Sequence, residues 1–117
     1  MIPLTPERIA AVYECLRAFP IFDKWKLPQS HALGFHVSKT NLIHGSVYEQ
    51  NAMIWMEVST KGVSTLALLQ TVVGHEMVHV KQKVDKLETP NTFHNADFMK
   101  RWRSVCSRYG WDQSLFV

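Results

Sequence analysis

The sequence predicts an α+β fold, in which a β-rich middle segment lies between helical segments. Apolar residues recur at helical spacing near the N-terminus and again from Ser64, whereas residues 32–60 carry short runs of β-branched and aromatic residues. The chain has 117 residues, of which 46% are hydrophobic and 20% charged, and this is enough for one core. We therefore expect a single domain over residues 1–117, and we expect it to be a monomer.

The first helix is predicted over about residues 6 to 18. Thr5 followed by Pro6 is a favourable start, because a threonine at this position can accept a hydrogen bond from a free backbone N–H of the first turn. Apolar residues then recur at helical spacing until Pro20, which cannot continue a helix. The N-terminal region has no continuous apolar run, so it predicts neither a signal peptide nor a membrane span, and we expect a cytoplasmic protein.

Three short antiparallel strands are predicted in the middle of the chain. The segments "LGFHVSKT", "LIHGSVYE" and "AMIWMEVST" are rich in β-branched and aromatic residues and are separated by turn-forming residues. Two helices follow, the first from Ser64 to near Lys86 and the second from near Asn95 to a stop at Gly110. The predicted order is one helix, three strands and two helices.

Three polar residues interrupt the apolar pattern of the longer helix, in the stretch "VVGHEMVHVKQ". His75 and His79 are four residues apart, so their side chains lie above one another on one helix face and can share a metal ion. Glu76, next to the first histidine, can approach such an ion without binding it, where a general base is needed. This is the H-E-x-x-H pattern of zinc metalloproteases.

The same spacing is compatible with two ordinary surface histidines and an exposed glutamate. Apolar residues on both sides of the motif favour the metal site over this alternative. Gly74 directly precedes His75, although glycine inside a helix costs about 1 kcal/mol relative to alanine. We therefore expect Gly74 to have a packing or access role.

A catalytic zinc site needs a third protein ligand, and four residues are candidates. Asp85 lies six residues after His79, as in the extended metzincin pattern, but the glycine that this pattern needs for its turn is absent. Glu88 and Asp97 are possible carboxylate ligands. His94 is the strongest candidate, because it lies fifteen residues after His79 and residues between them can turn the chain back.

The segments "HEMVH" and "HNADF" resemble the SprT-like domain, a family that includes bacterial SprT proteins and the DNA-dependent protease Spartan. The resemblance implies a zincin-like fold with one zinc ion per chain, held by His75 and His79 on the longer helix and by His94 on the helix that follows it. It also implies that Glu76 is the catalytic base and that Phe98 packs near the third ligand. The chain departs from the family in having Asn95 in place of a glycine, and its residues contain no C-terminal zinc ribbon.

These residues predict a zinc-dependent metalloprotease that hydrolyses peptide bonds of protein or peptide substrates. Zinc lowers the pKa of its water towards about 7, and the glutamate takes the proton and returns it to the leaving amine. In related zinc proteases the substrate lies along a sheet edge beside the metal helix. The strand nearest that helix in sequence is residues 52–60, where we expect backbone pairing with the substrate.

Two other classes of function remain open. The chain could be an adaptor that binds zinc without catalysis, although such a module needs no glutamate base. It could also bind nucleic acid, because residues 81–108 carry seven basic residues against three acidic ones: Lys81, Lys83, Lys86, Lys100, Arg101, Arg103 and Arg108. The resemblance and this charge together predict weak DNA binding and a role in cleaving DNA-associated proteins.

Overall fold

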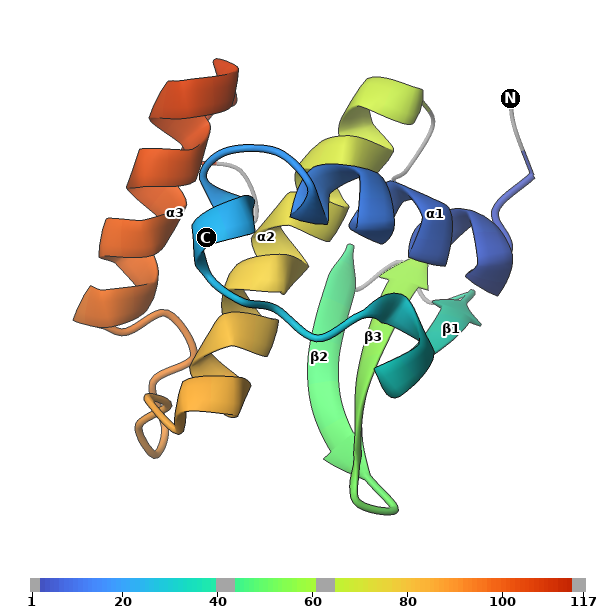
Figure 1. Cartoon of the computed structure of the whole chain (residues 1–117), viewed down its shortest axis with the longest axis horizontal. Helices are drawn as coiled ribbons and strands as arrows, with labels where there is room; N and C mark the ends of the chain where they lie inside the picture. Colours follow the sequence, from blue (N-terminus) through green and yellow to red (C-terminus); the bar gives the residue numbers. More distant parts are fainter. Residues whose placement is uncertain (1–2, 40–43, 61–64, 115–117) are drawn as a thin grey trace.

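The computed structural model describes residues 3–39, 44–60 and 65–114, and it has the predicted α+β class and element order (Figure 1). The elements are α1 (Pro6–Arg17), β1 (Gly34–Ser38), β2 (Gly45–Gln50), β3 (Met53–Ser59), α2 (Leu66–Asp85) and α3 (Ala96–Tyr109). Two short 3-10 helices, η1 (Phe22–Lys24) and η2 (Ser30–Ala32), lie between α1 and β1. No helix in the described ranges has the length and apolar character needed to cross a membrane.

The helix ends follow from capping residues that the sequence contains. The side chains of Thr5, Thr65 and Asn95 accept hydrogen bonds from the first turns of α1, α2 and α3. Lys86 and Gly110 adopt the left-handed conformation that ends α2 and α3. The predicted bounds agree to within two residues. Three predicted strand positions, 40 and 42–43, and the predicted helix start at 64 lie outside the described residues.

The sheet is mixed, so the prediction of three antiparallel strands is wrong. Its strand order is β1-β3-β2, with β2 antiparallel to β3 and β1 parallel to β3. Successive strands reverse direction along the chain, so placing β3 between the other two leaves it parallel to β1. The segment 52–60, which we expected at a sheet edge, is therefore the central strand. The two edge strands are β1 and β2.

Helix α2 is the centre of the fold. It packs against α1, α3, β2 and β3, and Figure 1 shows α3 on the side of α2 that lies away from the sheet. The residues from Thr71 to Val78 are all buried, whereas an amphipathic surface helix would bury one face only. The core consequently surrounds the helix that carries the H-E-x-x-H motif, and polar groups on that helix are held away from water.

Candidate metal centre

Three histidines converge in the structure from two separate segments. His75 and His79 lie on successive turns of α2, and His94 lies in the turn directly before Asn95, the N-cap of α3. One imidazole nitrogen from each histidine lies within 4.8 Å of the corresponding nitrogens of the other two. His94 was expected on the helix itself, but it precedes α3 because Asn95 must be extended to cap it. The cluster could hold one metal ion.

The geometry of the rings agrees with a single shared ion. The ring centroids of His75 and His79 are 5.3 Å apart, and that of His94 lies 5.0 Å from the first and 5.1 Å from the second. Two nitrogens bound to a tetrahedral zinc at about 2.0–2.1 Å are roughly 3.4 Å apart. Small side-chain rotations would therefore bring the three nitrogens into coordination.

Burial keeps these histidines in the neutral form that binds metals. Loss of hydration, with a smaller effect of the neighbouring histidines, lowers the pKa of His75 to about 2. Loss of hydration, with smaller effects of His94 and Lys83, lowers the pKa of His79 to about 3. Burial also lowers the pKa of His94. Neutral imidazoles suit zinc, copper, iron and nickel, so the donor set fits a transition-metal ion.

An aromatic wall supports the three imidazoles. The Phe98 ring lies 4.4 Å from the rings of both His79 and His94, and the Trp102 ring lies 4.8 Å from that of His75. Phe98 and Trp102 are fully buried. The resemblance implied that Phe98 packs near His94, and the structure has this contact. These rings limit the rotation of the imidazoles and keep water away from the inner side of the cluster.

Glu76 is buried beside the edge strand. It is 3% exposed, and burial raises its pKa to about 8. Its Oε1 atom has no hydrogen-bond partner among residues 3–39, 44–60 and 65–114. A Cβ atom at Gly45 would lie 3.1 Å from Glu76 Oε2 and 2.9 Å from the Glu57 carbonyl oxygen. Only glycine therefore lets β2 approach this carboxyl group without displacing it.

Gly74 has the packing role that the sequence indicated. A Cβ atom at this position would lie 2.5 Å from the Trp111 ring, which stacks on Tyr109 with a centroid separation of 4.9 Å. Any larger residue would push the indole away from α2. The glycine thus allows Trp111, which follows α3, to pack against α2 next to His75 in the sequence.

The competing carboxylate ligands are engaged elsewhere. Asp85 forms an ion pair with Lys81 at 2.8 Å, and Glu88 forms one with Lys83 at 2.8 Å. Asp97 accepts a hydrogen bond from Arg101 at 3.0 Å. None of the three carboxylates belongs to the histidine cluster. Of the four predicted candidates, His94 is the one that the structure brings to His75 and His79.

The other histidines and two tyrosines lie outside the cluster. His31, His36 and His44 are exposed. The Tyr109 hydroxyl donates a hydrogen bond to the Pro20 carbonyl oxygen. Tyr48 lies at an odd spacing from Gly45 on β2, so it faces the side of the sheet opposite to Glu76. Neither tyrosine is positioned to assist chemistry at the cluster.

Two residues that matter for the site were not identified from the sequence. Gly45 makes room for the Glu76 carboxyl group, and Gln82 is a fully buried amide on α2. The available signals were a glycine inside a strand pattern and a glutamine one turn after His79 on the same helix face as the two histidines. Both signals mark special positions without saying what lies opposite.

In comparisons with known proteins, no family model and no curated protein matches this chain.

Proposed function

We propose that the protein is a zinc-dependent metalloprotease of the H-E-x-x-H type. The observation that carries this proposal is the convergence of three neutral imidazoles, with a buried glutamate directly after the first of them. A purely structural metal site would be complete with a closed set of ligands. Three protein ligands leave a coordination position for water or substrate, which is the arrangement of catalytic zinc. The resemblance of the two motifs to the SprT-like family supports the same reading.

The metal would be held by His75, His79 and His94. A zinc ion bound there would supply Lewis acidity, which would polarise a carbonyl group and make a water molecule more acidic. The family resemblance favours zinc among the metals that imidazole binds, and the tetrahedral preference of zinc suits three ligands plus one open position.

Glu76 is the proposed general base and then general acid. A carboxyl group with a pKa of about 8 exchanges protons readily near neutral pH, which is the property that such a role needs. Its carboxylate accepts a proton from the attacking water and its carboxyl group then donates that proton to the leaving amine. A cation bound to the histidines would favour the ionised form of Glu76 and so prepare it to act as the base.

The substrate is proposed to pair with the edge strand β2. The central strand β3 has partners on both sides, so it has no free edge to offer. β2 has one outer edge that no other described strand pairs with, and its Gly45 lies against Glu76. An extended peptide bound along β2 would be held by backbone hydrogen bonds, which give affinity with little selectivity for sequence.

The test is the Glu76→Gln variant, which keeps the size of the side chain and removes the base. We expect this variant to bind zinc at one ion per chain while peptide-bond cleavage, measured on an unfolded protein substrate, falls by about 10²-fold or more. Glu88→Gln is the matched control, since its carboxylate lies outside the cluster. Cleavage by Glu76→Gln at the wild-type rate would rule out the assigned base.

A zinc-binding adaptor without catalysis is the alternative that this experiment also addresses. The adaptor would bind zinc in both the wild type and Glu76→Gln but would cleave no substrate in either form. A glutamate buried without a hydrogen-bond partner for Oε1 in the described chain is costly, and an adaptor has no use for it. This favours the enzyme.

We also propose that the substrates are DNA-associated proteins, on the basis of the basic residues in segment 81–108. Three of the seven basic residues form ion pairs with neighbouring carboxylates: Lys81, Lys83 and Arg101. The other four are not engaged in an ion pair in the described ranges, namely Lys86, Lys100, Arg103 and Arg108. DNA binding would therefore rest on these four side chains, and we expect it to be weak and independent of sequence.

A further inference from the structure

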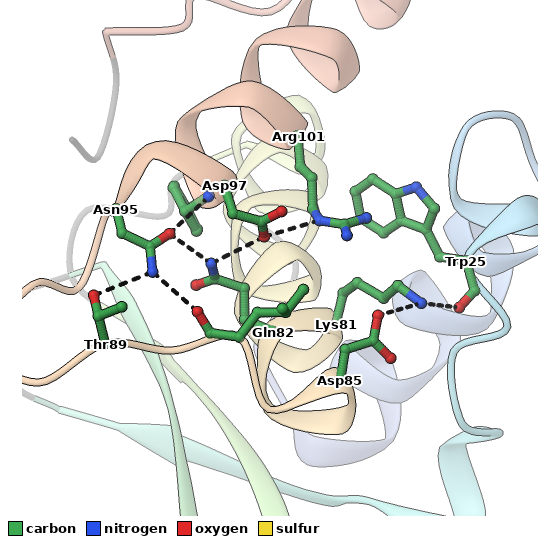
Figure 2. A network of polar contacts seen from close by, with 10 residues as sticks. Trp25, Lys81, Gln82, Asp85, Thr89, Asn95, Asp97 and Arg101 are labelled. Atoms are coloured by element: carbon green, nitrogen blue, oxygen red, sulfur yellow. Dashed lines mark hydrogen bonds and ion pairs between the residues drawn. The ribbon is translucent and has the colours of Figure 1, made fainter.

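A buried amide on α2 connects the metal helix to the segment that carries the third histidine. Gln82 is 0% exposed and lies three residues after His79. Its Nε2 atom donates hydrogen bonds to Asn95 Oδ1 at 2.8 Å and to Asp97 Oδ2 at 3.2 Å (Figure 2). One side chain of the metal helix thus holds the start of α3.

Asn95 extends this connection to both ends of the turn that precedes α3. Its Oδ1 atom accepts a second hydrogen bond from the Phe98 N–H at 2.9 Å, which caps the helix. Its Nδ2 atom donates to the Leu87 carbonyl oxygen at 3.1 Å and to Thr89 Oγ1 at 3.3 Å. The amide of Asn95 therefore closes residues 87–95 into a loop, as Figure 2 shows.

The stability of the core does not explain why residue 82 is polar. Gln82 Oε1 is buried and has no hydrogen-bond partner in the part of the chain that the structure describes. A buried polar atom left in this way destabilises a fold, and an apolar side chain of the same length would avoid that cost. The polar residue must then contribute something that an apolar one would not, namely its two hydrogen bonds to Asn95 and Asp97.

We propose that Gln82 and Asn95 form an amide clamp that positions His94 for the metal. This inference rests on the proposed metal site. His94 is the residue before Asn95, so fixing the Asn95 side chain and backbone fixes the direction from which the imidazole enters the cluster. Asn95 also positions Phe98, whose ring packs against both His79 and His94. The glycine found here in the resembled family has no side chain and could not form such a clamp.

The clamp acts by lowering the entropy that the turn loses when the metal binds. Apart from the Asn95 contacts, the backbone of residues 87–93 is held by the hydrogen bond from the Leu87 N–H to the Gln82 carbonyl oxygen and by the bridge between Thr89 and Thr92, and Glu88 pairs with Lys83 at the surface. The side chains of this segment are mostly exposed, with Phe93 at 82%. A turn with so little packing samples many conformations unless a specific contact selects one. Preorganising the third ligand in this way raises metal affinity without adding a ligand.

The test compares Gln82→Met with Gln70→Met. The first removes both donors at nearly constant volume, and the second makes the same change at a partly buried glutamine elsewhere on α2. We expect Gln82→Met to weaken zinc binding about 10–100-fold, as loss of a residue that orients a ligand does. Its Co²⁺ complex should lose the strong visible absorption of tetrahedral coordination. Gln70→Met should match the wild type in both measurements.

A second measurement and a second variant keep the test decisive. In the metal-free protein, amide hydrogen exchange at residues 87–95 should be faster in Gln82→Met than in Gln70→Met. Should Gln82→Met fail to fold, Asn95→Ser can replace it, because serine retains the helix cap and removes the two donors to Leu87 and Thr89. Asn95→Ser should likewise weaken zinc binding and alter the Co²⁺ spectrum.

The outcomes separate this inference from the proposed function. Zinc affinity and a Co²⁺ spectrum like those of the wild type in Gln82→Met, or in Asn95→Ser if that variant is used, would overturn the clamp and leave the metalloprotease proposal intact. A wild-type protein that binds no transition metal would overturn both.

Discussion

The helix α2 and the turn at residues 87–95 contribute to the candidate metal centre in different ways. α2 holds His75 and His79 through its own backbone hydrogen bonds and is packed on several sides by α1, α3 and the sheet. The turn holds His94 largely through the side chain of Asn95. Two ligands are therefore placed by the periodicity of a helix, and the third depends on contacts between residues distant in sequence.

A metal site of this kind is rigid where a helix holds its ligands and can fail where a turn holds them. A buried helix can shift its histidines only by disturbing the core. A turn with exposed side chains can lose its conformation while the rest of the fold persists.

The largest effect should come from removing a ligand. His79→Ala and His94→Ala should each weaken zinc binding by at least about 100-fold, because two imidazoles hold zinc far less well than three. His94→Ala should retain the better residual binding, since His75 and His79 stay fixed on α2. Competition with a chromogenic chelator measures both affinities.

Asp85→Ala and Glu88→Ala are the controls for the third ligand. Their carboxylates pair with lysines, so removing them should leave zinc affinity close to that of the wild type. Full zinc binding by His94→Ala together with its loss in Asp85→Ala or Glu88→Ala would show that His94 is not the third ligand.

The second effect concerns acid and the metal-free protein. The pKa of His75 is about 2 in the fold against an ordinary value of 6.5, so below pH 6.5 the unfolded chain binds a proton that the folded one does not. Stability therefore falls on acidification, by about 2 kcal/mol between pH 6.5 and 5 for this histidine. His94 is less buried and should contribute less.

The contributions of His75 and His94 to the pH dependence of stability should be compared in a Glu76→Gln background. The pKa of Glu76 is raised to about 8 from an ordinary 4.5, so its contribution to stability has the opposite sign, present at low pH and lost as pH rises through that window. Urea unfolding at the two pH values, with and without His75→Leu or His94→Leu, isolates each histidine. If His75→Leu and His94→Leu changed the pH dependence of the unfolding free energy equally, the difference in burial between the two histidines would have no effect on stability.

The smallest effect concerns the basic residues on the two helices. Lys100→Ala and Arg103→Ala on α3 should each lower the salt dependence of DNA binding by roughly one unit of slope, if these side chains contact phosphates. Lys81→Ala on α2 should change it less, because this lysine already pairs with Asp85 and the Trp25 carbonyl oxygen. Fluorescence anisotropy at several salt concentrations measures the slopes, and no salt-sensitive binding in the wild type would remove the DNA link.

The helices and the two-histidine pair could be predicted from the sequence because their signals are local. Capping by Thr5 and Asn95, the apolar periodicity of α2 and the spacing of His75 and His79 all involve residues within one or two turns of each other. Such signals do not depend on how the rest of the chain folds.

The strand pairing and the surroundings of the site could not be predicted in the same way. The runs of β-branched residues locate strands but do not say which strand is central, so β3 was expected at an edge. The contacts of Gly45 with Glu76 and of Gly74 with Trp111 join segments far apart along the chain. A single sequence contains each residue of such a pair but not the distance between them.

The placement of His94 in a turn would affect the lifetime of an ion bound at the proposed site. Release of the metal would not require α2 to unfold, because opening residues 87–95 alone withdraws one of three ligands and leaves a weakly held ion. The dissociation rate would then follow the frequency of that local opening rather than the rate of global unfolding. The emptied protein would keep two ligands in place, so it could be reloaded quickly without refolding.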